Sequence, residues 1–464
     1  MASEQASHTY ETNEDTSDGF SNSRNKNNNL LAGSLPDFFK NLPRLGDKST
    51  MINLIHAHWF PLASQGNIYS LTTLRSPKGS NKVLVASLKR KIYSFEYNQH
   101  SKWRLKPLVK ELLFTYIPNG AEIIAIDAYN KSNAGDEFVI GITIMKPSGE
   151  TSIERYLNIY TEGVGEGDES NSLESIAQNC LMVELSYTPY MLYHTIIPQE
   201  SGNEIVWLIS GNDNRIHMIR EDKQNHSYTE SQLEKYFPEL DQLKAIALWV
   251  DIYYYNERLT AISCECGLFK LAKVNVGSLE IIQNWILRYD NPISSVRIFP
   301  SQNEIRKPAF LNIDYDTKKE VNINVLLNTG NVAVIFQDVL NQQMNSDVLL
   351  SGNELTSDCI LCSCVADINM DGQNEILLGT YKQEVLVFGP VNNSWKMIDK
   401  KLFDAPVHSM SYLDLAGDGV KVLVVLTQRS VHIMQHDIKE IMKKWQDRFL
   451  QLSSLMNLSD ETDD

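Results

Sequence analysis

The sequence is poor in the features that mark secreted and membrane-spanning proteins. Its six cysteines are spread unevenly over 464 residues, which is unlike a disulfide framework and indicates a reducing compartment. Apolar runs such as Val422–Leu426 are far shorter than the roughly 20 residues that cross a bilayer. The first residues also lack the apolar core of a secretory signal. We therefore expect a cytoplasmic protein that reaches membranes only through its partners.

Basic residues are also in deficit. The chain has 42 lysines and arginines against 58 aspartates and glutamates, and its formal net charge is −16. A negative field repels the phosphate backbone of nucleic acids and anionic lipid. The short basic run Lys89–Lys91 has no interleaved aromatic residues and is typical of a solvated turn. We expect protein partners, no nucleic acid and no direct membrane insertion.

Common catalytic motifs are missing as well. The sequence has no P-loop, no G-x-G-x-x-G and no H-E-x-x-H. A Ser/His/Asp arrangement can be drawn from Ser210, Asp213 and His217, but nothing places the serine on a nucleophile elbow. A hairpin turn is the simpler interpretation, and we expect no enzymatic activity.

What the sequence does contain is one pattern repeated seven times. Each copy is a short apolar run, a small or polar turn and an alternating strand, which together predict a β-hairpin. The copies lie at 83–95, 138–160, 206–219, 259–272, 323–336, 376–388 and 422–434. Four of them follow a strand that ends near an aspartate, at 125–130, 249–254, 365–372 and 412–419.

These repeats predict an all-β fold, a seven-bladed β-propeller over residues 51–436. A strand, an acidic turn and a hairpin supply most of a four-stranded blade, and a closed ring buries both faces of every blade while leaving few edges. A pair of β-sandwiches is the alternative, although it would not need a repeat of this length. Residues 1–50 are polar and predict a disordered tail, and Thr161–Ser172 predicts an acidic loop.

The C-terminal region changes its period. Asp437 and Glu440 form a helix-capping signal. Apolar residues then recur at helical spacing, namely Ile438, Ile441, Met442, Trp445, Phe449, Leu452 and Met456. An amphipathic helix over 437–458 is predicted, followed by an acidic tail over 459–464. The helix either packs on its own propeller or docks a partner.

The most specific local motif is an acidic turn. Alternate residues of a tight loop place Asp367, Asn369 and Asp371 inward, Gly372 permits the bend, and Glu375 could close an oxygen shell around a hard cation such as Ca²⁺. The alternative, which we favour, is that these groups cap the turn by accepting backbone N–H groups. We therefore expect no cofactor, with Ca²⁺ as the alternative.

Other candidate ligand sets look structural. The turn at Asp414 and Asp418 resembles the first one but has Ala416 and Val422 at two ligand positions. His56 and His58 form an H-x-H pair without an apparent third ligand. The pairs Cys264/Cys266 and Cys362/Cys364 would each share a strand face, and they lie two blades apart, too far for one zinc site.

Several separated stretches carry a resemblance to a known family. They are KELLFTYIPNGAEIIAIDAYNKS (110–132), SLESIAQNCLMVELSYTPY (172–190), LISGNDNRIHM (208–218), YFPEL (236–240), SDCILCSCVADINMDGQNEILLGTYKQEVLVF (357–388) and YLDLAGDGVKVLVV (412–425). The resemblance spans about residues 64–436 in consistent order, and the chain resembles the kaptin family of animal propeller proteins. No match is apparent for residues 1–50.

The resemblance implies a scaffold. Kaptin-family proteins are similar to FG-GAP-type propellers, pair with another FG-GAP-repeat protein, and belong with it to KICSTOR, a lysosome-associated assembly. That assembly holds a GATOR-type GTPase-activating complex, so that nutrient loss silences the rapamycin-target kinase complex. The family is also associated with actin filaments of lamellipodia and stereocilia. It supplies no catalytic residues, and its metal-like turn maps onto Asp367, Asn369, Asp371 and Glu375.

Overall fold

The computed structural model describes most of the chain beyond residue 53. The described residues are 54–76, 81–97, 107–131, 137–149, 152–161, 173–199, 202–301, 322–345, 347–350, 358–391, 394–437, 439–443, 446–447 and 449–450. The chain divides into two units, Met1–Thr50 and Met51–Asp464, and all described residues belong to the second. The predicted tails over 1–50 and 459–464, and the predicted acidic loop apart from Thr161, lie outside the described residues.

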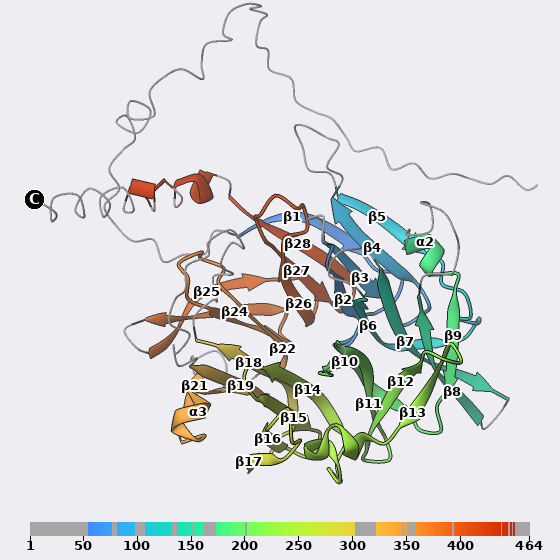
Figure 1. Cartoon of the computed structure of the whole chain (residues 1–464). Coiled ribbons are helices and arrows are strands. Elements are labelled where there is room, and N and C mark those ends of the chain that lie inside the picture. Colours follow the sequence, from blue (N-terminus) through green and yellow to red (C-terminus); the bar gives the residue numbers. More distant parts are fainter. Residues whose placement is uncertain are drawn as a thin grey trace, which may run out of the picture. The chain divides into compact units, whose positions relative to one another are not determined.

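The described strands form seven four-stranded antiparallel sheets arranged around a common centre (Figure 1). The first blade is β2 (Leu71–Leu74), β3 (Lys82–Ala86), β4 (Ile92–Tyr97) and β5 (Pro107–Leu112). The second is β6 (Glu122–Asn130), β7 (Phe138–Ser148), β8 (Ser152–Tyr160) and β9 (Cys180–Glu184). The third is β10 (Pro189–Ile197), β11 (Glu204–Gly211), β12 (Ile216–Asp222) and β13 (Ser227–Ser231).

The remaining blades follow the same order from the innermost strand outward. The fourth is β14 (Ala247–Tyr254), β15 (Arg258–Cys264), β16 (Leu268–Val274) and β17 (Ile281–Arg288). The fifth is β18 (Ile293–Pro300), β19 (Ile323–Thr329), β20 (Val332–Phe336) and β21 (Asp347–Leu350). The sixth is β22 (Ile360–Ala366), β23 (Glu375–Thr380), β24 (Glu384–Val391) and β25 (Ser394–Leu402). The seventh is β26 (Val407–Leu413), β27 (Val422–Thr427), β28 (Ser430–His436) and β1 (Leu54–Pro61).

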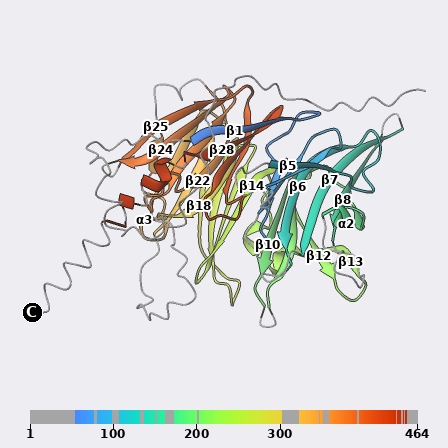
Figure 2. The same ribbon diagram turned by 90° about the horizontal axis from the view of Figure 1, so that it is seen from above.

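The seventh blade closes the ring with both ends of the repeat region. Its outermost strand, β1, pairs antiparallel with β28, so that Leu54 lies opposite His436 and Pro61 opposite Ser430. Figure 2 shows β1 and β28 side by side, although they are the first and last strands of the chain. The innermost strands β26 and β2 are in contact, which joins the seventh blade to the first. The predicted seven-bladed propeller is confirmed.

The seven predicted hairpins are the second and third strands of the seven blades. These strands carry the most apolar stretches of each repeat because both faces of a blade are covered by its neighbours. In β15, β19, β23 and β27 every residue is buried. The outermost strands alternate between exposed and partly buried residues. The hydrophobic pattern therefore located the middle of each blade better than its rim.

Apolar clusters between neighbouring blades hold the ring together. One cluster joins the second and third blades through Trp207, whose ring lies against the backbone of Gly141. A Cβ atom at Gly141 would be 2.8 Å from the Trp207 ring, so only glycine fits there without a shift. Another cluster joins the seventh and first blades, where Phe60 of β1 packs with Phe95 of β4. The closing strand is therefore part of the core.

Helical structure is sparse among the described residues. The short elements are α2 (Leu173–Ile176), α3 (Val339–Gln342), η1 (Leu233–Lys235) and η2 (Pro238–Leu240). Past β28, residues 439–443, 446–447 and 449–450 are helical, but the residues between them are not described. Ile441 is buried, whereas Met442, Phe449 and Leu450 are exposed. The amphipathic helix predicted over 437–458 therefore stays a prediction. Across the described chain, no helix has the length and apolar character needed to span a membrane.

Candidate functional site

The acidic turn after β22 is built by carboxylates that accept backbone N–H groups. Asp367 accepts the N–H of Asp371 at 2.9 Å and that of Gly372 at 3.0 Å, one on each oxygen. Asp371 in turn accepts the N–H of Gln373 at 2.8 Å. Gly372 has a φ of +92°, a conformation that favours glycine. This is the turn-capping arrangement.

Glu375 lies beneath the turn as the first residue of β23. Its side chain is fully buried and accepts the backbone N–H groups of Ile368 at 2.8 Å and Asn369 at 3.3 Å. The side-chain amide of Asn369 donates to Asp371 and to Glu375. Burial raises the pKa of Glu375 to about 7, and the two nearby aspartates add to the rise while the backbone N–H groups oppose it. A buried carboxyl thus ties the turn to the blade.

The sibling turn after β26 has the same shape of capping, in which aspartate side chains accept backbone N–H groups of the turn. Asp414 accepts the N–H groups of Gly417 at 2.7 Å and Gly419 at 2.8 Å, and Asp418 accepts that of Val420 at 2.9 Å. This turn lacks a carboxylate equivalent to Glu375, because Val422 stands at that position. The aspartates of both turns therefore have a structural task that does not depend on a cation.

The donor set of the first turn is chemically suited to Ca²⁺, but its present arrangement is that of a closed cap. Three carboxylates and an amide oxygen are the ligands that Ca²⁺ takes. The Asn369 amide directs its N–H groups at the carboxylates of Asp371 and Glu375, and its oxygen accepts the backbone N–H of Asp371 at 2.8 Å. Within the described ranges, no cluster of three or more His, Cys, Asp or Glu residues has metal-binding geometry. Cation binding would require the Asn369 amide to turn over.

The aspartates in the repeats at 125–130 and 249–254 have a different role. Asp127 and Asp251 lie in the middle of β6 and β14, not in turns as the sequence pattern predicted. Each accepts a backbone N–H from the innermost strand of the next blade, at His194 (2.8 Å) and Ile298 (2.7 Å) respectively. Tyr193 of β10 accepts the N–H of Ile252 at 3.2 Å in the same way. These side chains join successive blades around the centre.

The centre of the ring carries further polar side chains. Tyr69, which precedes β2, reaches the fourth blade, where its hydroxyl donates to the carbonyl of Leu248 at 2.7 Å and its ring stacks on Trp249. The guanidinium of Arg297 on β18 lies 4.7 Å from the centre of the Trp249 ring. Burial raises the pKa of Asp251, and the Arg297 charge partly offsets that rise. These contacts connect the segment before the first blade with the fourth blade, and the fourth blade with the fifth.

A cavity of about 740 Å³ lies beside the turn at Asp213. His217 projects there between two carboxylates, with Nδ1 2.7 Å from Glu230 and Nε2 3.1 Å from Asp213, and its ring stacks on Tyr187. Ser210 instead accepts the backbone N–H of Met191 and is buried. The structure therefore brings together the histidine and the aspartate of the drawn triad, whereas the Ser210 hydroxyl is engaged by the Met191 N–H instead.

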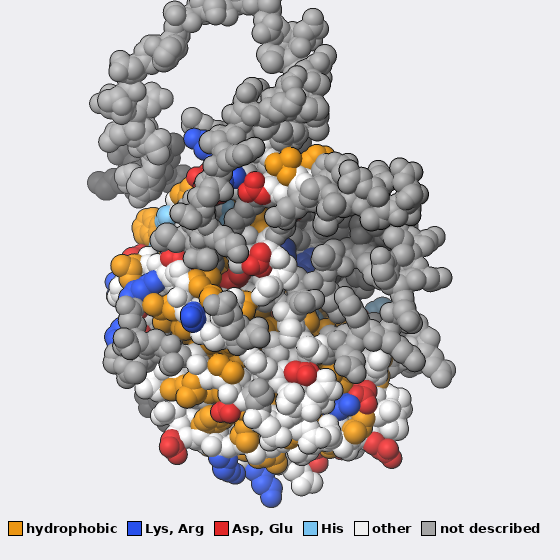
Figure 3. All heavy atoms as spheres, turned by 90° about the vertical axis from the view of Figure 1, so that its left-hand side faces the viewer, with side chains coloured by type: hydrophobic (Ala, Val, Ile, Leu, Met, Phe, Trp, Pro, Cys, Tyr) orange, Lys and Arg blue, Asp and Glu red, His pale blue; other side chains and the backbone are white. Residues whose placement is uncertain are grey.

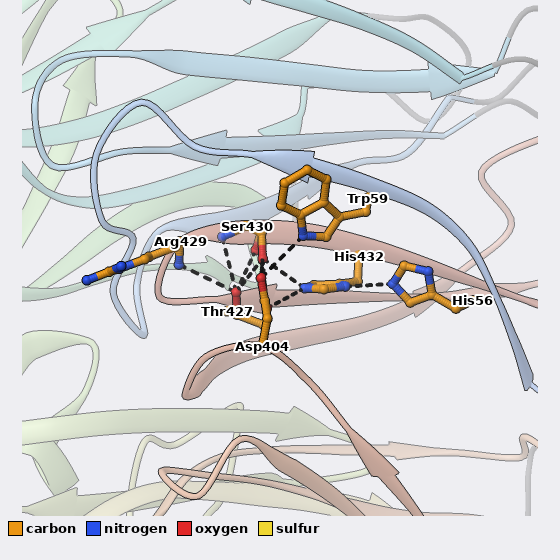
Figure 4. A network of polar contacts seen from close by, with 7 residues as sticks. All are labelled: His56, Trp59, Asp404, Thr427, Arg429, Ser430 and His432. Carbon is orange, nitrogen blue, oxygen red and sulfur yellow. Dashed lines mark hydrogen bonds and ion pairs between the residues drawn. The ribbon is translucent and has the colours of Figure 1, made fainter. Parts of the chain in front are cut away.

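A second histidine network fastens the closing strand (Figure 4). The Nε2 atom of His432 lies 2.8 Å from the Ser430 hydroxyl and 3.0 Å from Asp404, and its Nδ1 atom lies 2.7 Å from Nε2 of His56 on β1. Trp59, also on β1, donates to Asp404 at 3.3 Å. In a nucleophilic triad the serine and the carboxylate contact opposite ring nitrogens, whereas here they share one. The fully buried Ser430 therefore belongs to a hydrogen-bond network that holds β1 against the seventh blade.

Burial and hydrogen bonding shift the pKa values of His432 and Asp404 in this network. Burial lowers the pKa of His432, and the carboxylate of Asp404 only partly offsets this. Burial alone would raise the pKa of Asp404, but the His432 ring and the hydrogen bonds from Ser430 and Trp59 hold it below its usual value. The two histidines of the H-x-H pair are separated by a bulge, and His58 packs on Tyr97 whereas His56 contacts His432.

The segment YFPEL, one of the stretches that carry the family resemblance, is anchored by a buried ion pair. Glu239 of η2 accepts from Arg258 at 2.9 Å and from the Thr260 hydroxyl at 2.7 Å, and both charged side chains are almost completely buried. The Arg258 guanidinium also lies over the Phe237 ring at 4.5 Å. No sequence signal predicted this pair, because Glu239 belongs to the short helix η2 and Arg258 to the strand β15.

The cysteines differ in part from expectation. Cys362 and Cys364 both lie on β22, as predicted, but only Cys264 lies on β15, and Cys266 stands exposed in the following turn. The turn at Gly267 moves Cys266 off the strand face that the spacing predicted. Burial raises the pKa of Cys264 to about 12. All six cysteines are free.

Comparison with known sequences assigns the family. The sequence pattern of the family described as KICSTOR complex protein kaptin matches residues 54–446. The chain belongs to the kaptin family. A kaptin-family relative from Mus musculus, described as KICSTOR complex protein kaptin, is 36% identical over 386 residues, which cover 81% of this chain and 86% of the relative. The family match begins at the first residue of β1 and includes every strand of the ring.

A solved structure, described as "Structure of Dos1 propeller", is similar to this kaptin-family chain. It has a TM-score of 0.49 and 10% sequence identity, over 84% of this chain and 97% of that one. The fold assignment rests on the seven sheets themselves rather than on this similarity.

Proposed function

We propose that this chain is a non-catalytic scaffold subunit of a KICSTOR-like, lysosome-associated complex. The complex recruits a GATOR-type GTPase-activating complex and restrains rapamycin-target kinase signalling when nutrients are scarce. The observation that carries the proposal is family membership over the whole ring, from residue 54 to residue 446, together with the KICSTOR designation of the relative. The partners we expect are an FG-GAP-repeat propeller protein and the other subunits of that complex.

The structure is well suited to this task. A closed ring whose blades are joined by buried side chains is a rigid body that presents turns and outer strands to partners. On the face shown in Figure 3, hydrophobic, acidic and basic side chains are interspersed with many uncharged ones. The clusters around Asp127, Asp251, Asp367 and His432 join blades, cap a turn and hold the closing strand.

The regulatory part of the proposal is tested by loss and replacement in cells. Without this protein, phosphorylation of rapamycin-target kinase substrates should persist after amino-acid withdrawal, because the GTPase-activating complex no longer gathers at lysosomes. Expression of the full chain should restore both the lysosomal signal and the fall in phosphorylation. Unchanged signalling in cells that lack the protein would remove the proposal.

Calcium binding at the turn over 367–375 is a separate and weaker proposal. It rests on the oxygen chemistry of Asp367, Asn369, Asp371 and Glu375. Calorimetric titration of Ca²⁺ into the full chain, beside Asp371→Ala and the matched sibling-turn variant Asp418→Ala, tests it. Binding heat that is lost only in Asp371→Ala would support a site. No heat in the unmodified chain would show that capping is the whole role of the turn.

Direct actin binding is the alternative function, and it comes from the family resemblance alone. The net charge of −16 works against association with an acidic filament. Co-sedimentation with filaments at physiological salt decides it, and pelleting no greater than background would exclude direct binding.

A further inference from the structure

Outermost strands of a propeller expose unpaired backbone groups, and most strands at this rim carry charges that discourage pairing with other chains. Charged side chains lie within β5 (Lys110, Glu111), β9 (Glu184), β13 (Glu230), β21 (Asp347) and β25 (Lys396, Asp399, Lys400, Lys401). The closing strand β1 is instead bulged between His56 and His58 and ends at Pro61. In β9, β21 and β17 the single charge lies at one end of the strand, and of these three β17 is the longest and exposes the most large apolar side chains.

The sequence of β17 is IIQNWILR, with no charge before its last residue, Arg288. Three isoleucines expose large fractions of their side chains to solvent: 41% for Ile281, 46% for Ile282 and 57% for Ile286. Figure 1 places β17 at the outer rim of the fourth blade. An outer strand whose only charge lies at its end, and which exposes β-branched side chains, is a predicted site of strand pairing.

The strand is held rigidly, so its free edge is preformed. On the face toward the core, Trp285 and Leu287 pack against the apolar cluster of the fourth and fifth blades. The register with β16 has a bulge at Ile282, because Lys273 lies opposite Gln283 while Val274 lies opposite Ile281. Pairing is regular from Gln283 to Arg288. This regular stretch defines which residues a further strand would meet.

We propose that β17 pairs with β17 of a second copy of this chain, antiparallel and centred on Ile286, to form a two-fold symmetric dimer. In that register Ile286 lies opposite its own copy, Trp285 opposite Leu287, and Asn284 opposite Arg288. The two cross-strand pairings of apolar side chains are favourable on both faces of the sheet. The arginine meets an amide and not another arginine, so no like charges oppose each other.

This self-complementarity is the reason to name a second copy rather than another partner. A two-fold axis requires a strand to be compatible with its own reverse, and a charge near the centre would be repeated opposite itself. Within β17 the only charge lies two positions from the axis. The Arg288 side chain is exposed and can therefore reach Asn284 of the other copy. The dimer does not depend on the function proposed above.

Sedimentation equilibrium of the full chain at concentrations up to about 100 μM tests the dimer. We expect a reversible monomer–dimer equilibrium. Ile286→Lys should weaken it more than about tenfold, because two lysines would face each other at the axis. The matched control Leu349→Lys, at an equally exposed residue of β21, should leave the equilibrium unchanged. A chain that stays monomeric throughout, or equal effects of both lysines, would overturn the proposal.

Cysteine cross-linking tests the register. In a background of Cys266→Ser and Cys359→Ser, which removes the exposed thiols, Ile286→Cys should form a disulfide-linked dimer on mild oxidation. A residue on the axis lies opposite itself, within the Cα separation that a disulfide spans. Ile282→Cys should not link. Efficient linkage at residue 282 and none at 286 would contradict the register, as would linkage of neither in a sample that sediments as a dimer.

Discussion

Single buried side chains decide how this ring responds to pH. Glu375 is the clearest case, because its carboxyl is fully buried and its pKa is raised from an ordinary value of 4.5 to about 7. Between these pH values the folded chain holds more protons than the unfolded chain, so stability falls as pH rises. The contribution is fully present below pH 4.5 and is lost as pH passes through about 7.

Glu375→Gln should remove that slope, since glutamine keeps an oxygen for the N–H of Ile368 without burying a charge. Relative to its value near pH 4.5, the free energy of unfolding of the unmodified chain should fall by roughly 3 kcal/mol more than that of the variant by about pH 8. Urea denaturation at the two pH values measures the difference. Parallel pH profiles for the two proteins would show that Glu375 is not protonated in the folded state.

Residue-level packing gives a second prediction. Gly141→Ala places a methyl group 2.8 Å from the Trp207 ring, and the crowding should cost about 1–3 kcal/mol of stability. Gly277→Ala is the matched control, because its nearest neighbour would be 3.5 Å away, and it should change stability by less than about 0.5 kcal/mol. Chemical denaturation compares them, and a neutral Gly141→Ala would show that the two blades pack less tightly here than described.

The sequence predicted residue roles unevenly. It identified the capping turn at Asp367 because all of its members lie within nine residues. It misplaced Asp127 and Asp251, since a strand position and a following turn look alike when the next blade is unknown. It gave no sign of the pairing of Glu239 with Arg258 or of His56 with His432, because such contacts depend on how separate elements meet. Local chemistry is readable from sequence, and contacts across blades are not.

Among the individual elements, the YFPEL segment contains a buried ion pair that should be costly to break. Arg258→Ala leaves Glu239 buried without its cation and should destabilise the chain by about 3–5 kcal/mol. Removing both charges with Arg258→Met and Glu239→Leu should cost much less. A double-mutant cycle of Arg258→Met, Glu239→Leu and the two changes together, measured by denaturant unfolding, tests this, and additive losses from the two single changes would contradict a coupled pair.

The pairing of β1 with β28 gives the prediction that concerns ring closure. Ile55 lies opposite Gln435 in this pairing, and Ile55 is half-exposed, so Ile55→Cys with Gln435→Cys should form a disulfide, with loss of the Gln435 hydrogen bond to Tyr97. The bond would close nearly the whole ring and stabilise it by about 2–5 kcal/mol under oxidising conditions. The gain should vanish with reductant and be absent from either single variant. Failure to form the bond would mean that the two strands are not paired in this register.

For the molecule as a whole, the hydrophobic repeat was sufficient to predict the fold. Seven hairpins fixed the number of blades because the two central strands of each blade are buried on both faces and read as apolar runs. The outer strands β13 and β21 are short, and most of their residues are exposed or only partly buried. No hydrophobic pattern in the sequence therefore predicted them. Closure by β1 could not be seen either, since that strand is separated from its partner β28 by nearly the full length of the ring.

That a closed propeller of the kaptin family acts by holding protein partners can be tested by affinity purification of the full chain from cells. We expect an FG-GAP-repeat propeller protein and a large scaffold subunit to be recovered with it in comparable amounts. Recovery of neither, in a sample that unfolds cooperatively and is therefore intact, would show that the chain does not act as this scaffold.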